Sequence, residues 1–384
     1  MLDSLYIKNF RAFKTLEIDK LSNVNLIIGN NNSGKTCLLE ALRVYATNAS
    51  PLLLYNLISE RGQDWEIRFK LNENLVFQDI NHPFRYLFYG YKLPRINTES
   101  IEIGSLHNLE NRIKLYLSLY QTIETDTESR FVKLDSPSET DISLVDTEYV
   151  LELETYRTTQ RLVRLSKDIQ NIRRYSRSIS MSLSNHKSLH NIQFVPTDCI
   201  SDDILAGLWN NVSIKPTMKQ EVINALKLID SDIQDISVLL PKELNRNSIP
   251  REKEEITPIL IYNDDFRIPL KSLGDGITHL FHIVLALVNA QNGLLLIDEF
   301  ENGLHYSVQS KLWDLIFQLS EKLNVQVVAT THSKDCINAF EEIWKKYPDR
   351  ATFYRLDNYI SETEVMPYDR DSLGDILAID GEVR

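Results

Sequence analysis

The chain has 384 residues, with 42 lysines and arginines against 54 aspartates and glutamates, so its formal net charge is −12 at pH 7. A hydrophobic content of 43% and a charged content of 25% are typical of a globular protein and exclude wholesale disorder. The cysteines, Cys37, Cys199 and Cys336, lie too far apart for a dense disulfide framework or a CxxC metal knuckle. No basic start followed by an apolar run opens the sequence, and the apolar stretch at 280–290 is too short to cross a bilayer. We therefore expect a soluble, cytoplasmic protein that has no membrane partner.

The first part of the chain predicts three short strands and a helix. Apolar residues alternate or cluster at 4–9, 14–19 and 24–28, with Asn, Ser and Asp at the breaks, as is typical of strands. Between residues 35 and 47, apolar side chains recur at three- and four-residue spacings, which predicts a helix. Weaker strand-like pieces follow between residues 50 and 150.

Farther along the chain, apolar residues predict helices at 205–209 and 221–229 in an otherwise irregular region. After residue 255 the pattern becomes regular, and strands alternate with helices. The expected strands lie at 256–262, 293–297, 325–330 and 351–356, and the expected helices at 274–291, 307–319 and 334–346. Such alternation favours a mainly parallel sheet that is covered by helices on both faces.

Residues 29–36, GNNNSGKT, match the phosphate-binding pattern GxxxxGK[ST] and lie between a predicted strand and a predicted helix. Gly29 and Gly34 let the backbone turn so that successive N–H groups point inward, and the helix N-terminus adds partial positive charge. We expect Lys35 to reach the β- and γ-phosphates of a nucleotide, and the Thr36 hydroxyl to bind Mg²⁺. The candidate nucleotide-binding residues of this loop are Gly29, Asn30, Asn31, Asn32, Ser33, Gly34, Lys35, Thr36 and Cys37.

A second candidate feature is the apolar strand at 293–297, which ends in Asp298 and Glu299. The carboxyl end of a strand that is buried on both faces lies at the ligand crevice of an open parallel sheet. We therefore expect Asp298 to help bind Mg²⁺ and Glu299 to orient the attacking water. His332 follows another apolar strand, and we expect it to hydrogen-bond the γ-phosphate. The candidate catalytic residues are Glu299, His332 and Lys35, and the candidate metal ligands are Thr36 and Asp298.

These motifs, in this order, resemble those of the ABC-type AAA ATPases, in the soluble branch that includes RecF, the SMC proteins and the OLD (overcoming lysogenization defect) proteins. The resemblance covers NFRAF, NVNLIIGNNNSGKT and residues 268–332. It identifies a Walker A motif at 29–36, a Walker B motif at 294–299 and a D-loop at 301–305, with His332 as the switch histidine.

The resemblance also implies a signature segment at residues 272–276. There, Ser272, Gly274 and Gly276 would close over the γ-phosphate that another subunit binds, although the segment departs from the usual LSGGQ because Leu273 precedes the first glycine. For Arg11, in NFRAF, the family implies an approach to the nucleotide, and a solvated turn arginine is the alternative.

The implied fold is α/β, with a mainly parallel sheet of the P-loop ABC-ATPase type flanked by helices, an antiparallel β subdomain, and a helical insertion in the middle. We expect an N-terminal ATPase lobe with Walker A at 1–150 and an inserted, partly helical region at 151–255. A C-terminal ATPase lobe at 256–384 carries the signature segment, Walker B, the D-loop and the switch histidine.

The resemblance implies an ATPase that uses ATP and Mg²⁺ and forms an ATP-dependent homodimer or a higher oligomer. Our leading hypothesis is a role in phage defence or DNA surveillance, in which the ATPase controls a separately encoded nuclease or toxin effector. The alternatives are a RecF-like DNA-repair ATPase and the ATPase subunit of a transporter.

Two further sequence features bear on these hypotheses. A basic run between Arg157 and Lys187 predicts either a solvated face or a patch that binds DNA. Asp369-Arg370-Asp371 imitates the DxD pair of a Toprim nuclease, but the segment after His332 is too short for that extra domain. We therefore expect no Toprim nuclease domain.

Overall fold

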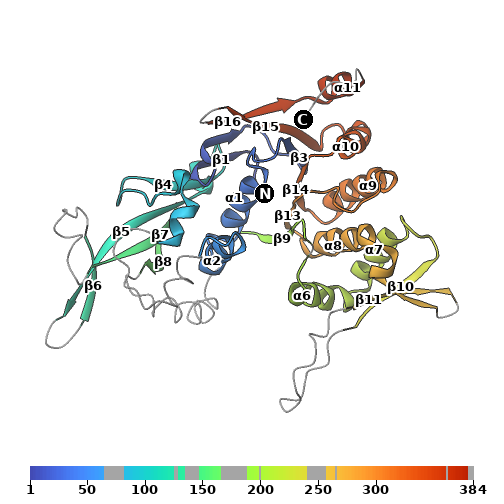
Figure 1. The fold of residues 1–384 in the computed structure, drawn as a ribbon, viewed down its shortest axis with the longest axis horizontal. Coiled ribbons are helices and arrows are strands. Elements are labelled where there is room, and N and C mark those ends of the chain that lie inside the picture. Colours follow the sequence, from blue (N-terminus) through green and yellow to red (C-terminus); the bar gives the residue numbers. More distant parts are fainter. Residues whose placement is uncertain are drawn as a thin grey trace, which may run out of the picture.

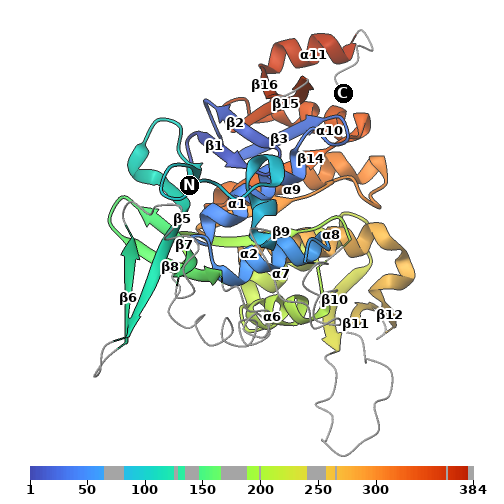
Figure 2. The ribbon, with the colours of Figure 1, turned by 60° about the vertical axis from the view of Figure 1, so that its left-hand side comes forward.

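The computed structural model describes residues 1–64, 82–124, 129–134, 147–165, 188–198, 200–239, 257–263, 266–359 and 362–378. These residues form three sheets together with the helices that cover them (Figures 1 and 2). Within these ranges, no helix combines the length and the apolar character that crossing a membrane requires.

The central sheet has six strands in the order β16-β15-β3-β14-β13-β9. The strands from β15 to β9 pair in parallel, and β16 pairs with β15 antiparallel. Their bounds are β3 (Val24–Gly29), β9 (Asn191–Val195), β13 (Gly293–Ile297), β14 (Gln326–Thr331), β15 (Ala351–Tyr359) and β16 (Glu362–Tyr368). Every residue of β3, β13 and β14 is buried, as expected for central strands of a sheet that is covered on both faces.

Alternate residues of the central strands enter two separate hydrophobic cores. In β3, Leu26 and Ile28 pack into one core and Ile27 into the other, because successive side chains of a strand point to opposite faces. Helices α8, α9 and α10 cover the first face, and α1 covers the second (Figure 1). Their bounds are α1 (Lys35–Ala46), α8 (Asp275–Asn289), α9 (Tyr306–Lys322) and α10 (Lys334–Lys346).

A second, seven-stranded sheet is antiparallel and lies on the α1 side, with the order β2-β1-β4-β5-β7-β8 and β6 paired with β5. Its strands are β1 (Leu5–Phe10), β2 (Phe13–Ile18), β4 (Ser100–Gly104), β5 (Arg112–Glu124), β6 (Ser129–Leu134), β7 (Thr147–Thr155) and β8 (Thr159–Leu165). Ile113, Leu115 and Leu117 of β5 enter the core that α1 and α2 (Pro51–Glu60) complete. The β5–β6 end of this sheet projects away from the central sheet (Figures 1 and 2).

A third sheet, of three antiparallel strands, lies beside α8 with two short helices. It consists of β10 (Ile233–Leu239), β11 (Thr257–Tyr262) and β12 (Arg267–Pro269), and the helices are α6 (Asp202–Ser213) and α7 (Pro216–Leu226). The last described element is α11 (Arg370–Ala378), which packs near α10 (Figure 1).

The prediction of a mainly parallel sheet is wrong for the described chain as a whole. Parallel pairing is confined to the strands of the central sheet that are joined by helical crossovers, and the other two sheets are antiparallel throughout. The reason lies in the connections. Strands joined by short turns, such as β1–β2 and β15–β16, can pair only antiparallel, because a parallel pair needs a long crossover. The predicted α/β class and the predicted antiparallel β region are confirmed.

The strands predicted at 4–9, 14–19 and 24–28 and the helix predicted at 35–47 are confirmed to within a residue or two. In contrast, α2 is a helix where the sequence indicates only strand-like pieces. Sheet pairings also cross the domain boundaries that we expect after residues 150 and 255. Strand β7 runs through the first boundary, and β10 pairs with β11 across the second.

Candidate functional site

The phosphate-binding loop, residues 29–36, joins β3 to α1 and depends on its two glycines. Gly29 has φ +151° and Gly34 has φ +100°. A Cβ on Gly29 would lie 2.4 Å from the carbonyl oxygen of Leu356, and a Cβ on Gly34 would lie 2.7 Å from the Phe13 ring. Both positions therefore exclude a larger residue. Asn32, at φ +65°, adopts the left-handed conformation that asparagine tolerates better than most residues.

The Lys35 side chain is folded onto this loop and is only 8% exposed. Its Nζ donates hydrogen bonds to the carbonyl oxygens of Gly29, at 2.6 Å, and Asn30, at 3.1 Å. Burial lowers the pKa of the Lys35 ammonium, whereas nearby carboxylates act to raise it. These carboxylates are Asp298, Glu299 and Glu301. The Lys35 ammonium is thus held at the loop, where a phosphate oxygen could replace one of the two carbonyl oxygens as its hydrogen-bond acceptor.

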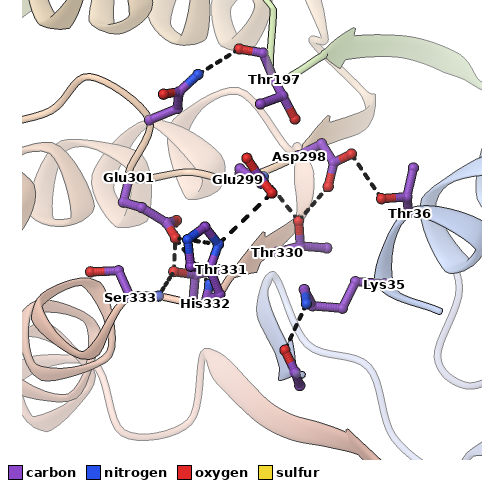
Figure 3. Close-up of polar contacts among 12 residues, drawn as sticks. Lys35, Thr36, Thr197, Asp298, Glu299, Glu301, Thr330, Thr331, His332 and Ser333 are labelled. Carbon is purple, nitrogen blue, oxygen red and sulfur yellow. Dashed lines mark hydrogen bonds and ion pairs between the residues drawn. The ribbon is translucent and has the colours of Figure 1, made fainter. Parts of the chain in front are cut away.

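Asp298 connects the loop helix to two strands of the central sheet. Its Oδ2 accepts a hydrogen bond from Thr36 Oγ1 at 3.1 Å, and its Oδ1 accepts one from Thr330 Oγ1 at 2.7 Å (Figure 3). Its backbone N–H donates to the Val195 carbonyl at 2.9 Å. The carboxylate therefore has a fixed orientation at the carboxyl end of β13.

The oxygen atoms of Thr36 and Asp298 fit a magnesium site. Mg²⁺ prefers oxygen ligands, and proteins usually bind it through one or two carboxylates together with substrate phosphates and water. Among the described residues, no group of three or more histidines, cysteines, aspartates or glutamates could hold a metal ion. At this pair a magnesium ion could take its remaining ligands from nucleotide phosphates and water.

Glu299 and His332 face each other beside Asp298 (Figure 3). Glu299 has φ +51°, a conformation that costs a residue other than glycine about 1 kcal/mol or more. Its backbone N–H donates to Thr330 Oγ1 at 3.0 Å, which stabilises this turn. His332 Nδ1 lies 3.8 Å from Glu299 Oε1, and the imidazole is 53% exposed, so it is accessible to a ligand.

Glu301 is a site residue that the sequence assigns only to the start of the D-loop. Its carboxylate accepts hydrogen bonds from Thr331 Oγ1 at 2.7 Å and from the His332 backbone N–H at 3.0 Å. The same carboxylate lies 3.2 Å from His332 Nδ1. The only signal for it in the sequence is the third acid of the run Asp-Glu-Phe-Glu.

The signature segment, residues 272–276, lies apart from the loop residues, at the N-terminus of α8. Ser272 is in a short 3-10 turn and is exposed, and Gly274 is the N-cap of α8 at φ +97°. A Cβ on Gly276 would lie 2.3 Å from the carbonyl oxygen of Gly303. The segment therefore packs against the turn that follows β13 in the same chain.

Two residues near the loop have structural contacts. The Cys37 thiol is buried and accepts a long hydrogen bond from Arg61 Nη2 at 3.6 Å. Arg11 is 3% exposed, and its Nε lies 2.8 Å from Glu40 Oε2. Its Nη2 donates to the Leu57 carbonyl at 2.8 Å. The interpretation of Arg11 as a solvated turn arginine is therefore wrong, because its guanidinium is buried, and its approach to a nucleotide stays a prediction.

The acids of Asp369-Arg370-Asp371 have local roles at the start of α11. Asp369 Oδ1 accepts a hydrogen bond from the Ser372 backbone N–H at 2.8 Å, and this bond lowers the pKa of its carboxyl. Arg370 pairs with Asp371 at 3.0 Å. This arrangement is a helix cap. In the basic run, Arg157, Arg161 and Arg164 are described, and the residues at 166–187 lie outside the described part of the chain.

A glycine loop at a strand–helix junction, with its lysine and threonine facing two acids at the end of another strand, defines a P-loop nucleoside triphosphatase. The sequence model of the family described as AAA ATPase domain matches residues 1–337. The chain therefore belongs to this family and is an ATPase.

The chain is also similar to individual proteins. The chain is 24% identical over 354 residues to a protein of Helicobacter pylori named ATP/GTP phosphatase, covering 89% of this chain and 88% of that protein. It is 28% identical over 123 residues to the DNA replication and repair protein RecF of Oenococcus oeni, covering 32% of this chain and 30% of RecF. The SMC head domain of Thermotoga maritima aligns with a TM-score of 0.42 at 11% identity, covering 96% of this chain and 98% of that chain. With the order of the motifs, the RecF match supports an ATPase of the ABC type.

Proposed function

We propose that the protein is an ATP-hydrolysing switch in which two copies of the chain enclose ATP. The observation that carries this proposal is the arrangement of Lys35 and Thr36, which follow β3, with Asp298 and Glu299, which follow β13, at the carboxyl ends of the two strands that flank β14. This arrangement supports one position for a triphosphate, with a cation, an oxygen pair for Mg²⁺ and a carboxylate around it.

In this proposal each residue has one task. The loop N–H groups and Lys35 bind the β- and γ-phosphates, and Thr36 and Asp298 hold Mg²⁺, which would neutralise charge on the phosphates. Glu299 accepts a hydrogen bond from the attacking water and orients it toward the γ-phosphorus. His332 donates a hydrogen bond to a γ-phosphate oxygen. Hydrolysis then yields ADP and phosphate.

The signature segment would complete the site of the second copy. The first N–H groups of α8 lack intrahelical partners and carry partial positive charge, so they suit an anionic γ-phosphate. Leu273, just before α8, and Tyr306, the first residue of α9, are 41% and 64% exposed and offer apolar contact to a second subunit. Loss of the γ-phosphate would remove the bridging charge and shift the population toward the open state.

Two substitutions test the proposal. Lys35→Ala is expected to abolish nucleotide binding, whereas Glu299→Gln is expected to keep binding, stop phosphate release and accumulate an ATP-dependent dimer. Glu60→Gln, an exposed acid on α2, serves as the control. The measurements are steady-state phosphate release and sedimentation velocity with and without ATP. Hydrolysis by Glu299→Gln at the wild-type rate would contradict the assigned role of Glu299.

For the biological role, we propose phage defence or DNA surveillance through control of a separately encoded nuclease or toxin. The similarity to a protein named for DNA replication and repair supports a role that involves DNA. The test is co-purification of the product of the neighbouring reading frame. Binding that depends on ATP and is lost in Lys35→Ala supports effector control, and ATP-independent behaviour contradicts it.

A second candidate, a RecF-like ATPase that binds DNA directly, is favoured by cations and aromatic rings at the β6–β8 end of the antiparallel sheet. The guanidinium of Arg164 lies 4.2 Å from the Phe131 ring centroid, and that of Arg161 lies 5.5 Å from the Tyr120 centroid. Arginines combined with aromatic side chains are typical of nucleic-acid surfaces. Acids share this face, since Glu148 pairs with Arg164 at 2.8 Å.

A gel-shift titration over a range of salt concentrations tests this candidate. Reversing Arg161 and Arg164 to glutamate is expected to weaken DNA binding and to reduce its salt dependence, because each phosphate contact releases counterions. Arg350→Glu is the matched control, since Arg350 is also a partly exposed arginine paired with a glutamate. Equal binding by the double reversal and the control would exclude this surface.

A further inference from the structure

We propose that Glu301 is a positioning residue for ATP hydrolysis, whose carboxylate holds His332 in place for its contact with the γ-phosphate. This inference rests on the role of His332 in the proposed function. It concerns how the side chain of His332 is oriented, which neither the motifs nor the relatives explain.

Glu301 has a largely buried carboxylate that contacts the exposed imidazole of His332. The Glu301 side chain is 11% exposed, whereas that of His332 is 53% exposed. Oε2 accepts a hydrogen bond from the buried hydroxyl of Thr331, and Oε1 accepts one from the backbone N–H of His332. The backbone and the ring of His332 are therefore held by one carboxylate, which is itself anchored to β14 through Thr331.

The distances favour Glu301 over Glu299 as the partner of the ring. His332 Nδ1 lies 3.2 Å from Glu301 and 3.8 Å from Glu299. Only the first distance is within the range of a hydrogen bond. Because Glu301 holds the ring, the Glu299 carboxylate can interact with water instead. With Nδ1 directed at Glu301, Nε2 is the nitrogen that can face the nucleotide, and in the protonated ring it is a donor.

Glu301 also lies next to the helix that carries the signature segment. Gly276 and Gly303 approach so closely that a Cβ on Gly276 would lie 2.3 Å from the Gly303 carbonyl oxygen. His279, one turn farther along α8, is 2% exposed and interacts electrostatically with Glu301. A displacement of α8 when a second copy docks would thus act directly on the turn that holds Glu301 and, through it, on His332.

The test is a double-mutant cycle on the full-length protein with ATP and Mg²⁺. Glu301→Ala is expected to lower kcat by about 10- to 100-fold, as for other residues that orient a catalytic ligand. The affinity for a fluorescent ATP analogue should change by less than about threefold, because the direct contacts of Glu301 are with Thr331 and His332 and its charge is the weakest of the three carboxylates that act on Lys35. Glu301→Gln, which keeps one acceptor oxygen, should fall between the wild type and Glu301→Ala.

The cycle with His332→Ala separates positioning from a structural role. In the His332→Ala background, Glu301→Ala is expected to change kcat by less than about twofold, because residues that act as a unit are not additive. Glu342→Ala is the matched control, since Glu342 is an exposed acid on α10 that accepts a hydrogen bond from Ser310 at 2.9 Å. Its kcat should equal that of the wild type.

The outcomes are distinguishable. Suppose that His332→Ala lowers kcat as expected, but that Glu301→Ala lowers kcat by the same factor in the His332→Ala background as in the wild type. This result would overturn the inference and leave the proposed function intact. Loss of ATP-analogue binding in Glu301→Ala would likewise assign the residue a structural role and overturn the inference. An unchanged rate in His332→Ala would contradict the proposed role of His332 and this inference with it.

Discussion

Thr330 donates a hydrogen bond of 2.7 Å to Asp298 across the adjacent parallel strands β14 and β13. The same hydroxyl accepts the backbone N–H of Glu299 at 3.0 Å, and Thr330 is fully buried. One side chain therefore fixes the proposed magnesium ligand and the proposed water-orienting residue together.

From this relationship we expect Thr330→Val to impair hydrolysis without blocking nucleotide binding. Valine has nearly the same shape, but it leaves Asp298 Oδ1 and the Glu299 N–H without their partner, at a cost of about 1–3 kcal/mol for each buried group. We expect kcat to fall by about tenfold or more, by analogy with the loss of an orienting partner. Thr330→Ser should restore most of the rate. A valine variant with wild-type kcat would show that the hydroxyl does not orient the acids.

Gly276→Ala is expected to disturb the contact between the signature segment and the turn after β13. The new Cβ would lie 2.3 Å from the Gly303 carbonyl oxygen, so the backbone must shift. Overpacking of this kind costs about 1–3 kcal/mol, and we expect a lower midpoint of urea unfolding. Gly207→Ala on α6 is the matched control, because nothing lies within 4 Å of its Cβ, and there the change should stabilise the helix by about 0.5–1 kcal/mol. Equal midpoints for the two variants would contradict the close approach.

The sequence predicts the parts of the site that are local. In the loop at 29–36 and in the strand that ends in Asp298, the functional side chains lie within a few residues of the strand and turn that position them. The local sequence pattern is therefore sufficient to predict both parts of the site. The roles of Thr330 and Glu301 depend on which strands become neighbours, and no local pattern encodes that pairing. The burial of Arg11 is missed for the same reason, because its partner Glu40 belongs to a different element.

The errors in the fold have similar causes. Helix α2 has the sequence PLLLYNLISE, in which the buried residues Pro51, Leu54, Leu57 and Ile58 have helical spacing. The helix is hidden because exposed Leu52 adds to the apolar run and blurs that spacing, although Pro51 at the first turn is favourable there. Strand β9, NIQFV, is polar for a member of the central sheet. Among the described strands it lies at the edge of that sheet and pairs with β13 alone, so it does not need the continuous apolar run of a central strand.

The buried ion pair beside the loop helix gives a prediction about stability. Glu40 on α1 lies 2.8 Å from Arg11 and 2.9 Å from Arg61, and the side chains of Glu40 and Arg11 are 6% and 2% exposed. Glu40→Ala would leave the Arg11 guanidinium buried without its counter-ion, which typically costs about 3–5 kcal/mol. We expect a correspondingly lower free energy of unfolding in urea.

Glu60→Ala provides the comparison for this prediction. Glu60 pairs with Arg43 at 3.4 Å, but its side chain is 51% exposed, and exposed pairs contribute about 0–1 kcal/mol. If Glu40→Ala lost no more stability than Glu60→Ala, the pair between Glu40 and Arg11 would not be buried as described.

The two histidines of α8 predict how stability depends on pH. Burial lowers the pKa of both His279 and His282 to about 4. The Glu301 charge acts in the opposite direction on the pKa of His279, whereas the Lys271 charge lowers the pKa of His282 further. In the unfolded chain a histidine titrates near about 6.5. Between these values the unfolded chain binds protons that the folded chain does not, so stability is complete above about pH 6.5 and is lost as the pH falls toward 4.

A shift of this size corresponds to about 3 kcal/mol for each histidine at the acidic limit. We expect His279→Leu to lose less stability than the wild type between pH 7 and pH 5, because leucine has no proton to bind. The measurement is urea unfolding at both pH values, with His107→Leu, whose side chain is 53% exposed, as the control. If His279→Leu and the wild type lost stability in parallel, burial of a neutral His279 would not contribute to acid sensitivity, and other groups that change protonation on unfolding would have to account for it.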